Sequence, residues 1–303
     1  VFMSVLLTDS DCELWFDELE PLNIKNIEMP YILDGNEYMY DLGKTTDFKD
    51  FYNKLRKGVS STTSALNIEQ YKNFLTPIFE SGEDVLYISF SHAMSGTFDQ
   101  LRIAMKELKE KFPNRKLTLF NTNAISVPSG IQVKAAAKLK ENGATDEEII
   151  SFLKEFTNNI ACYFMVNNLM HLKRGGRLSA TAAIAGSILN LKPILSFDSK
   201  GSLKVVNKII GRKAALNYLT KKVIEDAIDE EKYDAYIIDA DCRNETEEMA
   251  KKIKTSRPNL NVKLQTIGPV IGSHCGPDVV GVVFVAKNRV VELEKNISNV
   301  EVL

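Results

Sequence analysis

Apolar runs of strand length alternate with amphipathic stretches through the first half of the chain. The runs fall at residues 4–8, 27–33, 84–89 and 116–121. Between them, apolar positions recur every three or four residues after helix start signals, at residues 47–57, 68–82, 95–112 and 129–142. Because helices that alternate with strands cover both faces of a parallel sheet, this order predicts a doubly wound α/β domain over residues 1–158.

The second half follows a different pattern. Strand candidates fall at residues 161–166, 204–210, 234–240, 261–267 and 279–286, and helix candidates at residues 179–191, 212–228 and 244–256. Some strand candidates follow one another without a helix, so we predict an α+β domain with a mixed or antiparallel sheet over residues 159–287. Residues 288–303 form a tail. A short amphipathic helix would align Val290, Leu293 and Ile297, but we interpret the tail as partly ordered.

Composition narrows the function classes only slightly. The 303 residues are 44% hydrophobic with a formal charge of −2, so no basic excess indicates nucleic acid as a partner. The four cysteines are scattered without a CxxC pair, which argues against a metal site or a disulfide framework and favours a cytoplasmic protein. No apolar stretch approaches the roughly 18 residues of a membrane span, and the run after Met3 is too short for a signal peptide, so stable membrane insertion is not expected.

Two glycine-rich turns carry small polar side chains next to apolar runs. One reads Ser91-His-Ala-Met-Ser95-Gly-Thr97, and the other reads Gly268-Pro-Val-Ile-Gly-Ser-His274-Cys-Gly-Pro277. A buried anion needs several hydrogen bonds, which hydroxyls, an imidazole and free backbone N–H groups supply. The two turns therefore make a candidate anion site. Taken alone, Ser95 is better explained as an ordinary helix N-cap.

Other polar segments allow two readings each. His274 precedes a very apolar strand candidate, and its catalytic and structural interpretations are about evenly balanced. Its neighbour Cys275 would point to the opposite side of an extended segment, which makes a poor Cys–His pair.

The hydroxyl run at residues 60–64 fits a cap for the helix that starts at Ile68. The basic residues 173–177 suit a phosphate loop or a docking patch but do not match a Walker A loop, and the nearly all-apolar residues 180–191 suit core or the wall of a ligand channel.

Taken together, these segments resemble the DegV family of fatty-acid-binding proteins, the lipid-carrying subunits of bacterial fatty acid kinase. The similar segments occur in family order: Thr8-Asp-Ser10, Thr63-Ser64, Ser95-Gly-Thr97, Leu169 through Arg177-Leu178, Leu191-Lys-Pro-Ile-Leu195, Gly211-Arg-Lys-Ala214, and the turn from Gly268 to Pro277. Two departures permit a changed head-group environment or acyl preference. Ala65-Leu66 replaces the family's Gln-Pro, and Asn121-Thr122 stands where Asp-Ser or Asp-Thr is usual.

The resemblance implies a two-domain carrier that holds a long-chain fatty acid between its domains, with no catalytic residue, cofactor or metal of its own. Thr63, Ser64, Ser95, His274 and the Gly96 backbone would bind the carboxylate. Arg212 would lie near the carboxyl end, where a separate ATP-dependent kinase subunit makes an acyl phosphate.

Two readings from other classes stay open at this point. A hydrolase acting on a small acyl substrate would use Ser95 or Cys275 with His274, but Ser95 does not sit in a GxSxG motif and no third member of a triad is identifiable. An interaction module would use residues 173–177 and carry no lipid.

Overall fold

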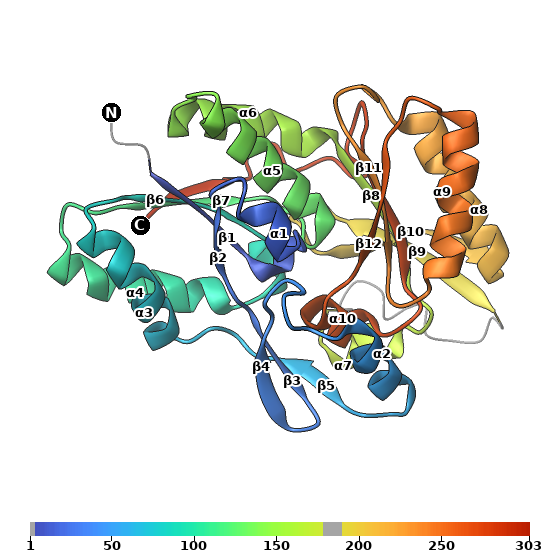
Figure 1. Ribbon diagram of the computed structural model, residues 1–303, viewed down its shortest axis with the longest axis horizontal. Helices are drawn as coiled ribbons and strands as arrows, with labels where there is room; N and C mark the ends of the chain where they lie inside the picture. The colour runs from blue at the N-terminus through green and yellow to red at the C-terminus, as the bar shows by residue number, and fades with distance from the viewer. Residues whose placement is uncertain (1–3, 178–189) are drawn as a thin grey trace.

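The computed structural model describes residues 4–177 and 190–303, which form three sheets (Figure 1). The first sheet has the strand order β14-β7-β6-β1-β2. Its strands are β1 (Val5–Asp9), β2 (Lys25–Ile27), β6 (Val85–Ser89), β7 (Leu117–Asn121) and β14 (Val300–Val302). All but β14 run parallel to their neighbours, as the alternating pattern predicts.

Helices cover both faces of this sheet. They are α3 (Ile68–Glu80), α4 (Thr97–Lys111), α5 (Val127–Glu141) and α6 (Asp146–Phe156). Figure 1 shows α5 and α6 on one side of the strands and α3 and α4 on the other. The predicted doubly wound domain is therefore confirmed. Because parallel strands end at one edge, the loops that follow β1, β6 and β7 lie side by side there.

The second sheet is mixed, as the sequence predicts. Its order is β10-β9-β8-β13-β11-β12, and only β11 and β12 pair in parallel. The strands are β8 (Ile160–Met165), β9 (Leu191–Phe197), β10 (Leu203–Ile210), β11 (Ala235–Asp239), β12 (Val262–Thr266) and β13 (Val280–Val285). Two helices, α8 (Arg212–Asp226) and α9 (Arg243–Ser256), pack on one face.

The two faces of this sheet belong to different cores. Ala161 and Met165 of β8 pack in the cluster beneath α8 and α9. Cys162 and Phe164, which alternate with them, pack in the cluster that fills the first domain. Successive side chains of a strand point to opposite faces of the sheet. One face therefore packs against the helices, and the other packs against the first domain and forms an apolar interface with it.

The third sheet departs from the sequence prediction. The expected strand at residues 27–33 is split: Ile27 ends β2, and β3 (Pro30–Leu33) joins the antiparallel order β4-β3-β5 with β4 (Asn36–Met39) and β5 (Ser61–Thr63). Pro30 has no N–H to continue the first ladder. The hydroxyl run expected to cap a helix is strand β5, and Asn67 instead caps α3 in a capping box.

The C-terminal tail is also more ordered than predicted. Val300–Val302 forms β14, which pairs antiparallel with β7, and Glu301 accepts hydrogen bonds from Arg102 at 2.9 and 3.1 Å. The backbone pairing of β14 replaces the helix that its apolar spacing allows. The predicted apolar helix at residues 179–191 lies largely outside the described residues; Leu191 itself begins β9, a strand that the sequence analysis missed.

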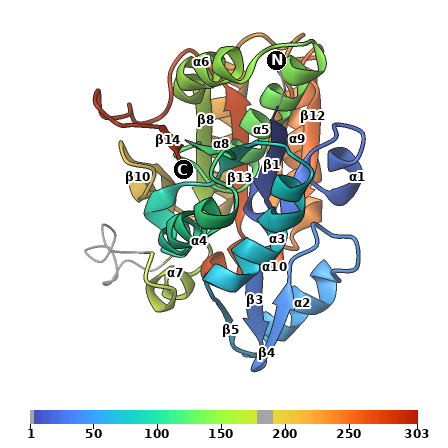
Figure 2. The same cartoon turned by 90° about the vertical axis from the view of Figure 1, so that its left-hand side faces the viewer.

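Short helices complete the described chain. They are α1 (Phe16–Leu19), α2 (Phe48–Arg56), α7 (Met170–Arg174), α10 (Pro269–Cys275) and the 3-10 turns η1 (Ser10–Cys12), η2 (His92–Met94) and η3 (Thr157–Asn159). Figure 2 shows α10 above the small sheet and close to α2 and α7, and it contacts all three. Over the described helices, we find none with the length and apolarity to cross a membrane.

Candidate functional site

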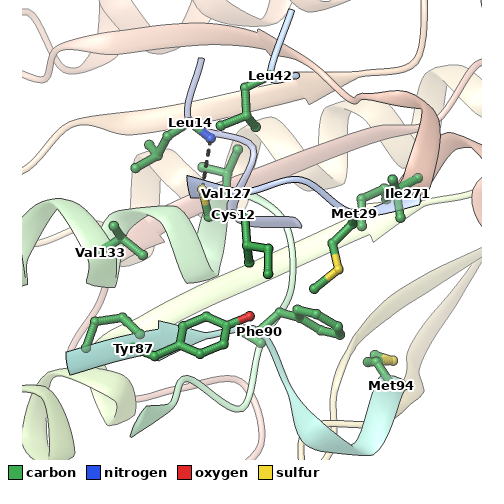
Figure 3. Packing of buried hydrophobic residues seen from close by; sticks show 14 of the residues in the cluster. Cys12, Leu14, Met29, Leu42, Tyr87, Phe90, Met94, Val127, Val133 and Ile271 are labelled. Atoms are coloured by element: carbon green, nitrogen blue, oxygen red, sulfur yellow. Dashed lines mark hydrogen bonds between the residues drawn. The ribbon is translucent and has the colours of Figure 1, made fainter. Parts of the chain in front are cut away.

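A cavity lies between the two domains. Most of its wall is apolar and comes from both domains: Met29, Phe90, Met94, Ile125, Pro128, Cys162, Phe164, Leu172, Phe197, Leu203, Ile238, Ile267, Val270, Ile271, Cys275 and Val279. Figure 3 shows Met29 and Ile271 on one side, with Phe90 and Met94 across from them. This lining suits a long apolar ligand.

Four predicted ligand residues come together on the wall of this cavity: Thr63, Ser64, Ser95 and His274. Ser64 is exposed and the other three are half-buried, whereas most of the apolar wall is buried. The polar group therefore lies toward the mouth of the cavity, and the apolar surface extends inward from it.

Thr63 and His274 are joined by a hydrogen bond. Thr63 Oγ1 lies 2.8 Å from His274 Nε2, and next to this pair the hydroxyl oxygens of Ser61 and Ser273 are 2.6 Å apart. The segment around His274, predicted as a turn, is the helix α10. Pro269 starts it, because the fixed φ of proline suits the first helical position and its missing N–H costs nothing there.

His274 is neutral at physiological pH. Burial and the nearby charge of Arg177 lower its pKa to about 4. Its Nδ1 atom is buried and has no hydrogen-bond partner among the described residues. Gly175 packs against it so closely that an added Cβ would lie 2.2 Å from Nδ1, so residue 175 needs to be glycine for this ring position.

The first domain anchors the start of α10. The buried Glu13 carboxyl accepts from the Gly268 N–H at 2.9 and 3.0 Å and from the Tyr40 hydroxyl at 3.0 Å, and the Tyr52 hydroxyl donates to the Ile267 carbonyl at 2.6 Å. Burial raises the pKa of Glu13 to about 8. These buried contacts fix His274 relative to the hydroxyls of the first domain.

Ser95 lies between the end of β6 and the start of α4. Its Oγ accepts from the Thr97 N–H at 3.1 Å. The N-cap position of α4 is occupied by Gly96, so the interpretation of Ser95 as the N-cap is wrong. A serine hydroxyl that accepts one bond still has its own hydrogen to donate. Gly96 precedes α4 and is not among the described residues that line the cavity.

Arg212 lies elsewhere, on α8, and is not among the described lining residues. Its guanidinium donates from Nε to a Glu245 oxygen at 2.8 Å and from Nη1 to the Asp278 carbonyl at 2.9 Å. Asp278 closely follows α10 in sequence, so this bond from Arg212 holds the C-terminal end of the segment that carries His274.

The cavity also contains charged residues that the sequence analysis did not assign to a ligand. Arg177 lines it and donates from Nε to the Met94 carbonyl at 3.2 Å. Asp11 also lines it, and burial together with the charges of Asp9 and Glu13 raises the pKa of its carboxyl. The basic segment from Lys173 to Arg177 could have identified Arg177 as a candidate, whereas no sequence motif marks Asp11.

The geometry disfavours a hydrolase. His274 bonds Thr63, and the described residues show no hydrogen bond between His274 and Ser95. Cys275 lines the cavity alongside His274, contrary to the expectation for an extended segment, because both lie on a helix. Burial raises the pKa of the Cys275 thiol to about 12, so it is not a thiolate nucleophile at neutral pH.

In the part of the chain described, we find no group of three or more His, Cys, Asp or Glu residues that could hold a metal.

Comparison with known proteins gives consistent matches over nearly the whole chain. The family model described as an uncharacterised protein of the DegV family matches residues 4–287. A DegV domain-containing protein from Clostridium perfringens is 34% identical over 285 residues, covering 94% of this chain and 98% of the relative. The crystal structure of DegV, a fatty acid binding protein from Bacillus subtilis, has a TM-score of 0.83 and 28% identity, covering 95% of this chain and 100% of that one. A fatty-acid-binding DegV family protein from Thermus thermophilus has a TM-score of 0.82 and 26% identity, covering 94% and 100%. This chain belongs to the DegV family.

Proposed function

We propose that this protein binds a long-chain fatty acid in the cavity between its domains, with the carboxylate at the mouth. The observation that carries the proposal is the division of the cavity wall: hydroxyls and a neutral imidazole at the mouth, and apolar side chains beyond them. The fatty acid binding described for the Bacillus subtilis and Thermus thermophilus relatives supports it.

The carboxylate would take hydrogen bonds from Ser64, Ser95 and the linked pair of Thr63 and His274. Because the imidazole is neutral, the bond within that pair leaves it one hydrogen to donate. Arg177 supplies a nearby positive charge without a carboxylate bonded to it among the described residues. Gly96 N–H, at the start of α4, adds a donor if the ligand extends that far. Neutral donors bind an anion selectively when they are held in place, and the Thr63–His274 bond holds the one donor that this pair keeps free.

The acyl chain would supply most of the affinity. Burying about 14 methylenes at ~0.8 kcal/mol each gives roughly 11 kcal/mol, against an association cost of roughly 4–15 kcal/mol. The polar group at the mouth then fixes the position of the chain and selects acids over other lipids.

We further propose that the protein presents this carboxylate to a separate ATP-dependent kinase subunit. A carboxylate oxygen would attack the γ-phosphorus of ATP, the bond to the β-phosphate oxygen would break, and acyl phosphate and ADP would form. Thr63, Arg177 and His274 also line a second hollow that contains Arg174. The positive charges of Arg174 and Arg177 in this hollow would attract a phosphate. Arg212, at the far end of the α10 segment, is the proposed contact with the kinase.

Two measurements test the proposal separately. Isothermal titration with palmitic acid tests binding, and we expect one site per chain. Incubation of the loaded protein with ATP and a fatty acid kinase catalytic subunit, with hydroxylamine to trap the product, tests presentation. Hydroxamate that depends on both proteins supports the kinase role. Binding without hydroxamate would restrict the protein to a carrier, and no binding would overturn the proposal.

A further inference from the structure

A second pair of polar side chains lines the same cavity and is more buried than the polar group at its mouth. Asp11 and Ser126 both line it and are only 4% and 6% exposed. Asp11 Oδ1 and Ser126 Oγ are buried with no hydrogen-bond partner among the described residues. By contrast, Thr63, Ser95 and His274 at the mouth are half-buried. Two unpaired oxygens on one apolar wall are unfavourable unless a ligand pairs with them.

A backbone hydrogen bond joins the two segments that carry these side chains. The Ser126 N–H donates to the Asp11 carbonyl at 2.7 Å, which ties the loop after β7 to the turn after β1. Ser126 is the N-cap of the 15-residue helix α5, but its hydroxyl makes no capping bond. Its φ of +66° is a backbone conformation that non-glycine residues rarely adopt. A serine in this position normally caps the helix with its hydroxyl, so this hydroxyl is left for another partner.

We propose that the ligand is a fatty acid bearing a hydroxyl group on its acyl chain, away from the carboxyl end, and that Asp11 and Ser126 bind this hydroxyl. The inference rests on the proposed fatty acid binding and names the subclass of acid. A hydroxyl both donates and accepts, so it pairs with both side chains. A plain alkyl chain leaves both unpaired.

The chemistry of Asp11 is suited to a neutral partner. Burial, then the charges of Asp9 and Glu13, raise its pKa, while Arg177 opposes this shift. A carboxyl accepts from an alcohol O–H in either protonation state, and its neutral form, which the raised pKa favours, also donates to the alcohol oxygen. The carboxylate of the fatty acid stays at the mouth with Thr63 and His274.

A competition experiment tests the inference. The protein is incubated with an equimolar mixture of stearic, 3-hydroxystearic and 12-hydroxystearic acids, and the bound acids are quantified by mass spectrometry after washing. We expect 12-hydroxystearic acid to be enriched about tenfold over stearic acid, the value of one or two added hydrogen bonds. Asp11→Leu should abolish the enrichment, Ser126→Ala should reduce it, and Asp11→Asn should largely retain it because an amide also donates and accepts.

Thr63→Val is the matched control, because it should weaken retention of all three acids without changing their ratio. Equal or preferential retention of stearic acid by the unaltered protein would overturn the inference and leave the proposed function intact. Enrichment that survives both Asp11→Leu and Ser126→Ala would also overturn it. Failure to retain any of the three acids would overturn the proposed function as well.

Discussion

Two histidines of this chain have the same pKa shift but different surroundings. Burial lowers the pKa of both His92 and His274 to about 4. The His92 ring lies 4.1 Å from the ring centre of Phe98, and its Nε2 is 3.0 Å from Ser89 Oγ. His274 lines the cavity, bonds Thr63 and has an unpaired Nδ1 among the described residues. A shifted pKa therefore reports burial, and only the position at the cavity distinguishes His274, the residue proposed to bind the ligand.

The largest expected effect separates the two histidines by ligand affinity. His274→Ala breaks the hydrogen-bonded pair that donates to the carboxylate and leaves Thr63 without its partner, so fatty acid affinity should fall about a hundredfold, within the range for hydrogen bonds to a charged group. His92→Ala should leave affinity within about twofold. Isothermal titration with palmitic acid measures both. A comparable loss in both variants would contradict the assignment of His274.

Moving the His274 ring without removing it should have a smaller effect. Gly175→Ala places a methyl 2.2 Å from Nδ1, so the ring must shift and affinity should fall about tenfold. Gly96→Ala is the matched control, because an added Cβ there meets no atom within 4 Å and the backbone N–H is kept. The same titration compares them. Equal affinity of Gly175→Ala and the unaltered protein would show that the ring position is not needed.

His92, like His274, should be visible in the pH dependence of stability, because the pKa of each is lowered to about 4. A histidine with a folded pKa near 4 and an ordinary pKa near 6.5 binds more protons when unfolded, so stability is lost as pH falls from 6.5 toward 4. His92→Phe removes this contribution, so the loss between pH 7 and 5.5 should be about 1 kcal/mol smaller than in the unaltered protein. Denaturant unfolding at the two pH values measures it. An unchanged pH dependence would place the pKa of His92 near its ordinary value.

The smallest expected effect tests the dual role of Ser95. Ser95→Ala loses one neutral donor to the carboxylate and one bond from the Thr97 N–H. We expect about a threefold loss of affinity and a stability change under about 1 kcal/mol. Titration and thermal unfolding on the same variant separate the two contributions. A stability loss with unchanged affinity would limit the role of Ser95 to its bond with the Thr97 N–H.

Local patterns were sufficient to predict the two domains and the mouth of the cavity. Apolar periodicity predicts β1, β6 and β7 and their helices, and the Thr63, Ser95 and His274 segments indicate an anion site. The missed features depend on contacts between distant parts of the chain. Strand β5 exists because Tyr31 and its neighbours pair with it, and β14 because β7 offers an open edge. Asp11 and Arg177 became candidates only once the fold placed them on the cavity wall.

The most direct test of the central claim is mass spectrometry of an organic extract from the purified, denatured protein. The account predicts a long-chain fatty acid at close to one molecule per chain, with the amount strongly reduced in His274→Ala and unchanged in His92→Ala. A protein that carries no fatty acid and takes up none when it is added would contradict the account.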